Sequence, residues 1–369
     1  MNRLEAYKQP LYELRFSPMC KPAAEVANLT QLESHTTRAR VLMMWRIAAG
    51  HLNWGKREAE LMYESTLDSI SQAFDVFEYP VSEFMLDARA DIWDLGLAPG
   101  SVKQSVEKHT TANPFPMEAK NNTLILAGEI AQVEDQNYIN ILNMVIEHNG
   151  LQAGIWVQSS GALQFVLGAR DAARELVKKI IEQVTANEVK MIIADGAETF
   201  WALTKMLEKL GLEFPKGIEI LHFNTFLKQC KTSKTVLEKP FVHDSRPACL
   251  LADSLANHLA IMPGYLQDEN VFGTGKIYCD AREIVDKYCT DRVIATWSRT
   301  LAKSCGADDG LWATHPQLAS GLARQRLDYF KGINAKSIIC PSPLCASYLN
   351  KQSLDDDLPI KWLPELLLD

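Results

Sequence analysis

The 369-residue chain lacks several features that would place it in a class at once. It has no excess of basic residues, because 38 lysines and arginines face 46 acidic residues and leave a net charge of −8. Proteins neutralise nucleic-acid phosphates with a basic face, so nucleic acid is excluded as the main partner. No apolar run approaches the roughly 20 residues that span a bilayer, and the first residues contain no apolar signal core. We predict a cytoplasmic protein without a transmembrane segment, or one that is peripheral to the membrane through a partner.

The chain also lacks any CxxC pair, which is the strongest sequence signal for a zinc or iron–sulfur site. It has eight cysteines, and seven of them follow residue 229. Thiols stay reduced in the cytosol, so a disulfide framework is not expected. Whatever soft-metal chemistry the chain has must lie in its last third.

Hydrophobic periodicity divides the sequence into a helical part and an α/β part. Apolar residues recur every three or four positions in 38–51, 56–77 and 81–95, which predicts amphipathic helices. The proline-containing segment HTTANPFPMEAKNN (109–122) has the composition of a linker. We expect a helical domain over 1–110 and a linker over 111–122.

After the linker the pattern changes to short apolar strands that alternate with helices, which is typical of parallel sheets. Strands are predicted at 123–128, 151–157, 190–195 and 217–223, and a second series begins at 239–245 and continues at 336–340. Among the helices between them, 168–187 is strongly amphipathic, and others are predicted at 249–259 and 316–331. We therefore expect one α/β unit over 123–235 and a second over 236–369. Their similar length indicates a diverged duplication.

The second unit carries a family resemblance in FVHDSRPAC, YCDAREIVDKY and KSCGADDGLWATHPQLASGLARQRLDYFKGINAKSIICPSPLCASYL. These segments resemble the CCG domain, which occurs twice in heterodisulfide reductase B-type subunits and in glycolate oxidase iron–sulfur subunits. Segment 123–235 is similar to a first CCG domain, with WVQSSGALQFVLG (156–168) at the Cys-Cys-Gly turn. Segments 11–40 and 60–99 resemble the helical ferredoxin-type module of the same proteins. The resemblance implies an α+β multidomain chain: an all-helical ferredoxin-like domain, then two tandem CCG-type α/β units with mainly parallel sheets.

Most of the cluster ligands that this resemblance implies are missing. A [4Fe–4S] cluster needs four thiolates, commonly spaced C-x2-C-x2-C-x3-C. In the helical module these positions fall on Leu14, Ser17, Cys20 and Ala24, and on Ser65, Asp68, Ser71 and Asp75. One thiol of eight remains, and hard oxygen donors suit such clusters poorly. We expect neither cluster of this module to assemble.

The two CCG-like units differ in how much they keep. The expected cysteines of the first unit fall near Glu129, Ser159, Ser160, Asp195 and Glu198. The second unit retains Cys305 and Cys345, whereas Arg246, Ser304 and Ser342 replace the other three. Cys249 and Cys340 lie within three residues of lost positions. The sequence thus leaves at most one remnant iron–sulfur or zinc centre, with Cys249, Cys305, Cys340 and Cys345 as its candidate ligands.

Other polar residues have both a functional and a plain interpretation. His243 and Asp244 form either a proton-handling pair or the cap of a following element, and Arg246 either fills a cluster position or binds an anion. Asp308 and Asp309 in CGADDG either bind a cation as hard-metal ligands or, as is more common for such a segment, form a solvated turn. The basic residues of the following helix indicate a solvated surface: Arg324, Arg326 and Lys331.

Three functions remain open at this point. The first is a degenerate iron–sulfur subunit that acts as a scaffold or regulator for a flavoprotein dehydrogenase or another oxidoreductase subunit. The second is a small-ligand-binding protein whose cleft between the α/β units is lined by Glu129, Ser159, Ser160, Asp195, Glu198, His243, Asp244 and Arg246. The third is an electron-transfer subunit that keeps one C-terminal metal centre.

Overall fold

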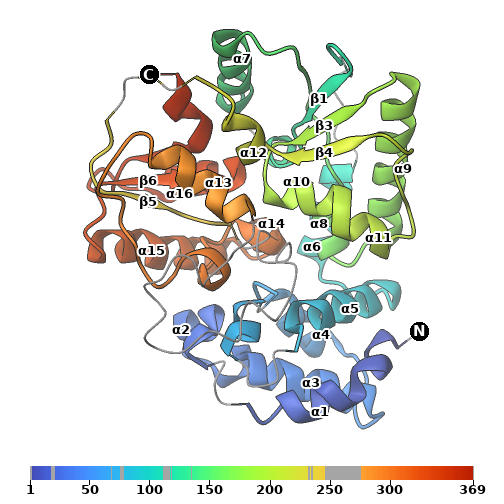
Figure 1. Ribbon diagram of the computed structural model, residues 1–369. Helices are drawn as coiled ribbons and strands as arrows, with labels where there is room; N and C mark the ends of the chain where they lie inside the picture. The colour runs from blue at the N-terminus through green and yellow to red at the C-terminus, as the bar shows by residue number, and fades with distance from the viewer. Residues whose placement is uncertain are drawn as a thin grey trace.

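The computed structural model describes residues 2–17, 21–67, 69–74, 79–110, 117, 119–133, 135–231, 233, 236–245 and 276–368. The chain forms a helical module below two α/β units that stand side by side (Figure 1). No helix in these ranges is long and apolar enough to cross a membrane. The predicted α+β class, with parallel sheets in both α/β units, is confirmed.

The helical module is built from short helices joined by 3-10 turns. Thr36 caps α3, because its hydroxyl accepts a hydrogen bond from the Ala39 N–H. The helices are α1 (Lys8–Leu14), α2 (Glu25–Thr30), α3 (Thr37–Ala48), α4 (Lys56–Tyr63), α5 (Val81–Asp94) and α6 (Gly100–Thr110). The long helix predicted over 56–77 is wrong, since α4 ends at Tyr63 and a 3-10 helix covers Ser69–Phe74. Helix α6 was not expected as a separate element.

The first α/β unit contains a four-stranded parallel sheet with the strand order β2-β1-β3-β4. Its strands are β1 (Thr123–Leu126), β2 (Gly154–Trp156), β3 (Met191–Ala194) and β4 (Glu219–His222). Its helices are α7 (Asn137–Asn149), α8 (Ala162–Val166), α9 (Arg170–Ala186), α10 (Ala197–Trp201), α11 (Leu207–Lys209) and α12 (Phe223–Leu227), with a π-helical turn at Ala202–Met206. Helix α9 buries the apolar face that the sequence predicts.

The second α/β unit contains a three-stranded parallel sheet with the order β5-β6-β7. Its strands are β5 (Pro240–Val242), β6 (Ser337–Cys340) and β7 (Ile360–Trp362). Its helices are α13 (Lys276–Val285), α14 (Leu311–Thr314), α15 (Pro316–Gly332) and α16 (Pro343–Gln352). The helix expected at 249–259 lies outside the described residues.

The strand register relates the two sheets to each other. Thr123 pairs with Met191 where β1 meets β3, and Pro240 pairs with Ser337 where β5 meets β6. Counting from these pairs, β1, β3 and β4 correspond in order to β5, β6 and β7. Each unit also has a glycine with positive φ that follows a serine or cysteine, Gly161 at +83° and Gly306 at +86°. The shared register and turn support the predicted duplication.

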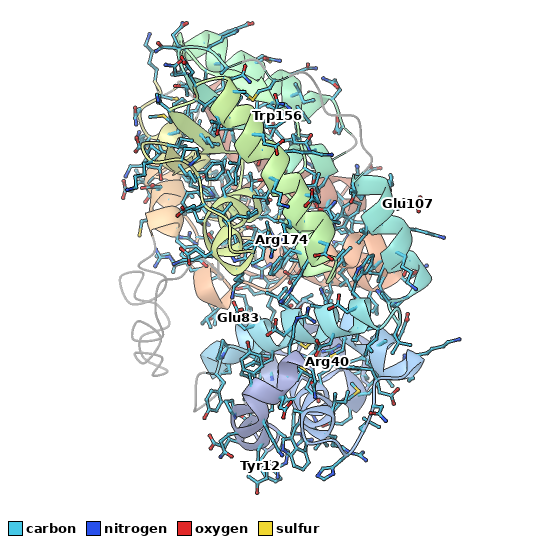
Figure 2. The ribbon with its side chains drawn as sticks, turned by 90° about the vertical axis from the view of Figure 1, so that its right-hand side faces the viewer. Tyr12, Arg40, Glu83, Glu107, Trp156 and Arg174 are labelled. Carbon is cyan, nitrogen blue, oxygen red and sulfur yellow. The ribbon has the colours of Figure 1, made fainter. Side chains whose placement is uncertain are left out.

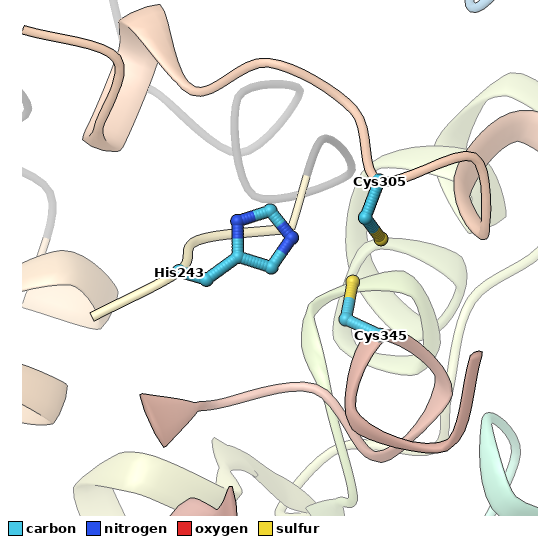
Figure 3. A group of neighbouring side chains, drawn as sticks. All are labelled: His243, Cys305 and Cys345. Atoms are coloured by element: carbon cyan, nitrogen blue, oxygen red, sulfur yellow. The ribbon is translucent and has the colours of Figure 1, made fainter. Parts of the chain in front are cut away.

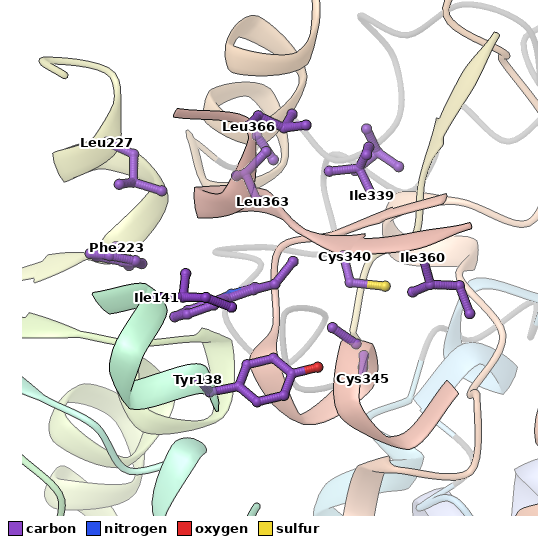
Figure 4. Close-up of a cluster of buried hydrophobic side chains, with 14 of the residues drawn as sticks. Tyr138, Ile141, Phe223, Leu227, Ile339, Cys340, Cys345, Ile360, Leu363 and Leu366 are labelled. Carbon is purple, nitrogen blue, oxygen red and sulfur yellow. The ribbon is translucent and has the colours of Figure 1, made fainter. Parts of the chain in front are cut away.

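The two α/β units share one apolar core (Figure 4). In it Tyr138 and Ile141 of α7 lie near Cys340 and Ile360 of the second sheet, and Phe223 packs on Trp362 with ring centroids 5.9 Å apart. A second core joins the helical module to α8, α9 and α10. Burial of this continuous apolar surface holds the three parts together.

Candidate functional site

Three buried carboxyl groups meet where the strands of the first sheet end. Glu129 and Asp195 follow β1 and β3, and Glu198 lies in the first turn of α10. The Asp195 carboxylate accepts backbone N–H bonds from Gly128 (3.1 Å), Glu129 (3.2 Å) and Ile130 (2.8 Å), and the Thr199 hydroxyl at 2.7 Å. Glu129 accepts the N–H of Glu198 at 2.8 Å. The loop after β1 is therefore folded around the carboxylate that follows β3.

Burial sets the protonation of these carboxyl groups. It raises the pKa of Asp195 to about 6 and that of Glu198 to about 7, although the hydrogen bonds that these carboxylates accept lower both pKa values. The pKa of Glu129 is raised well above its usual range by burial and by the charges of Asp195 and Glu198. Burial therefore favours the protonated form of Glu129.

The acidic group extends into the second unit. The Ser342 hydroxyl contacts Glu129 Oε2 and also accepts the N–H of Cys345 at 3.2 Å, which caps α16. Asp308 adds a further negative charge near Glu198 and accepts the Ser304 hydroxyl at 3.1 Å. One polar network therefore crosses the junction between the α/β units.

A soft-donor group lies in the second unit (Figure 3). One ligand atom each of His243, Cys305 and Cys345 lies within 4.8 Å of the others, and all three side chains are buried. His243 follows β5, and its backbone N–H donates to the Ile339 carbonyl of β6 at 2.9 Å. Cys305 lies in the Ser-Cys-Gly turn, and Cys345 lies in the first turn of α16. Three separate segments thus bring their donors to one point.

The protonation of this group favours a neutral imidazole. Burial, with the Arg326 charge, lowers the pKa of His243 well below its usual value. Neither ring nitrogen has a hydrogen-bond partner in the described part of the chain. A hydrogen bond to Cys305 and burial raise the pKa of the Cys345 thiol well above 9, which keeps it protonated until a cation binds. Orphaned buried nitrogens are rare, so this imidazole is available to a ligand.

The adjacent Asp244 has a structural role. Its carboxylate accepts hydrogen bonds from Nη1 and Nη2 of Arg282, at 2.9 and 2.8 Å, and from the backbone N–H of Arg299 at 2.6 Å. Although burial alone would raise it, the Arg282 charge and hydrogen bonds hold the pKa of Asp244 below its usual range. Asp244 therefore fixes the loop after β5 rather than acting on His243 as a proton partner.

The four predicted thiol ligands are not all in this group. The three of these cysteines that the structure describes all lie in the shared apolar core, but only Cys305 and Cys345 belong to the group of three donors, and Cys340 at the end of β6 does not. Burial and the nearby Cys305 raise the pKa of the Cys340 thiol well above 9. Cys249 and Arg246 lie outside the described residues.

Of the eight residues predicted to line a cleft, six are buried and bonded to the protein, whereas the His243 ring has no hydrogen-bond partner among the described residues and Arg246 lies outside them. Ser159 accepts the Gly161 N–H at 3.3 Å and Ser160 accepts the Ala162 N–H at 3.4 Å, while Gln132 donates to Glu198 at 2.5 Å. Ser304 repeats the Ser159 contact by accepting the Gly306 N–H at 2.9 Å. These groups satisfy one another without a bound ligand.

The positions at which the resemblance implies cluster ligands in the helical module hold protein contacts. Ser65 donates to the Met62 carbonyl at 3.0 Å and accepts from Arg89 at 3.2 Å, and Ser71 bonds to Thr37 at 2.7 Å. Leu14, Ser17 and Ala24 are buried as well. Cys20, Asp68 and Asp75 lie outside the described residues.

Two buried arginines stabilise this arrangement. Arg40, inside the helical module in Figure 2, donates to the carbonyls of Leu61 and His35 at 3.0 and 2.7 Å. Arg89 donates to the carbonyls of Val166 and Asp309, both at 3.2 Å, and so links the module to both α/β units. Carbonyl oxygens satisfy these cations where the resemblance implies an anionic cluster nearby.

Two sequence interpretations are wrong because local patterns do not report burial. Asp308 and Asp309 are 2% and 4% exposed and belong to the junction, not to a solvated turn. Arg326 is 3% exposed, although Arg324 and Lys331 of the same helix face carboxylates at the surface. A helical projection of α15 places Arg326 on the same face as Leu322 and Phe330. This position is the sequence signal that distinguishes Arg326 from Arg324 and Lys331.

A second donor group was missed, namely Glu60, Glu64 and His315, whose ligand atoms lie within 4.8 Å of one another. His315 bonds to Glu60 at 3.0 Å, and Glu64 bonds to His35 at 2.9 Å. The first pair connects α4 to the residue before α15, and the second connects the end of α4 to the 3-10 helix Glu33–His35, so the group has a structural explanation.

Comparisons with known proteins bear on the fold. The crystal structure of a hypothetical protein from Helicobacter pylori resembles this chain with a TM-score of 0.58 at 12% sequence identity, over 99% of this chain and 75% of that one. At this identity the likeness shows a common fold and no shared activity. No protein-family model and no curated protein matches the sequence.

Proposed function

We propose that this chain is a cluster-depleted relative of heterodisulfide reductase-type and glycolate oxidase-type iron–sulfur subunits. It acts as a binding subunit, a scaffold or regulator, of a flavin-linked oxidoreductase and carries no chain of clusters. Electron transfer along such a chain needs several thiolate-ligated centres. Apart from Cys305 and Cys345, the described residues at the positions where the resemblance implies cluster ligands are apolar side chains or hydroxyl and carboxyl groups.

The observation that supports this proposal is a set of hydrogen bonds within the helical module that engages its polar side chains. Ser65 and Ser71 bond to Arg89 and Thr37, and Glu25 next to Ala24 accepts the Thr66 hydroxyl at 2.8 Å. The Glu25 carboxylate also accepts the N–H of Ser304 at 2.5 Å, so the module is docked on the second unit. What is retained is a folded surface rather than an electron path.

The test is to isolate the affinity-tagged chain anaerobically from its native cells, with a tag-only control. We expect a complex that contains bound flavin and whose flavin reduction is unchanged when this subunit is removed and returned. Iron and acid-labile sulfide at four or more atoms each per chain, with a visible spectrum that bleaches on reduction, would contradict the proposal.

One observation favours a second activity, the binding of a single zinc-class ion in the second unit. Two thiols and an imidazole suit zinc, and three protein ligands with one open position are typical of catalytic zinc sites. Ligand atoms in a tetrahedral zinc site lie about 3.3–3.8 Å apart, given bonds of ~2.0–2.3 Å. The donor atoms of His243, Cys305 and Cys345 lie within 4.8 Å of one another, so only a small movement would bring them to these distances. Two thiols this close do not suit a four-iron cluster, which needs four thiolates spread around it.

This activity is tested by metal analysis of the purified chain and three variants. Cys345→Ser and His243→Gln remove one donor each, whereas Cys289→Ser removes a partly exposed thiol outside the group and serves as the control. We expect about one zinc per chain in the parent and the control and a loss of at least about 10-fold in affinity in the two donor variants. Equal zinc in all four proteins, or none in the parent, would exclude the site.

A further inference from the structure

A cavity of about 200 Å³ lies between α2 of the helical module and α15 of the second unit. Its wall combines the cations Lys303 and Arg326 with the rings of Trp297 and Tyr329 and the apolar side chain of Leu322. Asn28 and Gln325 are exposed, whereas Glu25, Ser304 and Arg326 are buried. The cavity therefore has exposed amide side chains at its opening and buried charged groups at its inner end. None of the three soft donors His243, Cys305 and Cys345 lines it.

Arg326 is incompletely satisfied at this floor. Its Nη2 donates to the Trp297 carbonyl at 2.6 Å, but Nε and Nη1 have no hydrogen-bond partner in the described residues. The guanidinium carbon lies 4.8 and 4.9 Å from the ring centres of Tyr329 and Phe330. These rings attract the cation but cannot accept the remaining N–H groups as a carboxylate would. A buried cation left in this state is costly unless an anion joins it.

Lys303 adds a second cation at the same wall. Its Nζ lies 3.9 Å from the Trp297 ring centre, and no ion pair of Lys303 is found among the described residues. Burial lowers the pKa of Lys303, and the Glu25 charge opposes that shift. Glu25 directs one oxygen to the Ser304 N–H and the other to the Thr66 hydroxyl. It thus balances part of the charge without occupying the donors of Arg326.

We propose that this pocket binds a small organic carboxylate, which accepts hydrogen bonds from Arg326 and pairs with Lys303. The Trp297 and Tyr329 rings and Leu322 would contact its apolar body. The volume limits the ligand to a few carbon atoms or one small ring, because drug-sized ligands fill about 300–1,000 Å³. One carboxylate in the wall beside two cations favours a monoanion over a dianion such as phosphate. This inference stands independently of the proposed subunit role.

The test is calorimetric titration of the full chain with benzoate and butyrate, with benzamide as the neutral analogue of benzoate and inorganic phosphate as the competing anion. Lys303→Gln and Arg326→Lys change the proposed donors. Lys351→Gln changes an exposed lysine on α16 and is the matched control. Circular dichroism establishes that each variant is folded.

We expect one carboxylate per chain, benzamide at least about 10-fold weaker, and affinity reduced roughly 10-fold or more by Lys303→Gln and Arg326→Lys, with Lys351→Gln unchanged. If Arg326→Lys does not fold, Lys303→Gln and the benzamide comparison decide. The proposal is overturned if neither carboxylate binds, if Lys303→Gln binds both equally well, or if phosphate binds more tightly than either carboxylate.

Discussion

The two α/β units have the same strand register and the same glycine turn, yet they end their strands in different chemistry. The position held by His243 after β5 corresponds to Leu126 in the first unit, and that of Cys340 corresponds to Ala194. The first unit gathers carboxyl groups that hydrogen bonds and protonation satisfy. The second gathers two thiols and an imidazole whose nitrogens are unbonded. One backbone can therefore support a closed polar junction or a soft-metal site.

The difference shows that similar α/β units can have different side-chain chemistry at the ends of their strands. Oxygen groups can be satisfied by backbone N–H groups that the loops already supply, as Asp195 shows. Thiols are weak hydrogen-bond groups and are packed as small apolar side chains or bound to a metal.

The largest effect is expected at the glycine turns. A methyl group on Gly306 would lie 2.2 Å from the Ala319 carbonyl oxygen, whereas one on Gly161 would lie 3.0 Å from the Ala173 carbonyl oxygen. Both glycines have positive φ. We expect Gly306→Ala to lower the free energy of unfolding by about 4 kcal/mol and Gly161→Ala by about 2 kcal/mol. Urea unfolding measures both, and equal losses would show that the turns are equally tight.

The next effect concerns the pH dependence of the first unit. The pKa of Glu198 is raised to about 7, so the folded chain binds its proton more tightly than the unfolded chain does. This contribution to stability is complete below about pH 4.5 and is lost as the pH rises through about 7. Glu198→Gln cannot ionise and keeps an acceptor for Gln132. We expect it to be more stable than the parent by on the order of 1–3 kcal/mol at about pH 8. The two proteins should converge at about pH 5, and a parent more stable at high pH would contradict this account.

A smaller effect is expected at the serines of the junction. Ser342 both contacts Glu129 and caps α16 through the Cys345 N–H, whereas Ser160 accepts one long bond of 3.4 Å. We expect Ser342→Ala to cost about 1–2 kcal/mol and Ser160→Ala no more than about 0.5 kcal/mol. Thermal unfolding of the two variants compares them. A larger loss for Ser160→Ala would place the important link in the first unit instead.

Much of the fold follows from sequence pattern, because β1, β3, β6 and helices such as α9 and α15 are continuous apolar or amphipathic segments. β7 and α8 were not anticipated, since a three-residue strand and a five-residue helix carry too few positions for periodicity to register. The family resemblance was enough to place Cys305 and Cys345 in one candidate site. Burial of Asp308 could not be predicted in the same way, because it depends on the docking of distant segments, whereas the helical projection of α15 contains the signal for Arg326. The side-chain network that closes the helical module is likewise a tertiary property.

The most direct test of the account is the zinc, iron and acid-labile sulfide content of the anaerobically purified chain, measured for the parent, Cys305→Ser and Cys289→Ser. The comparison of the two units predicts about one zinc per chain in the parent and in Cys289→Ser, loss of that zinc in Cys305→Ser, and no stoichiometric sulfide. Iron and sulfide in equal amounts that survive Cys305→Ser would contradict it, because they would place clusters in regions that the structure fills with protein contacts.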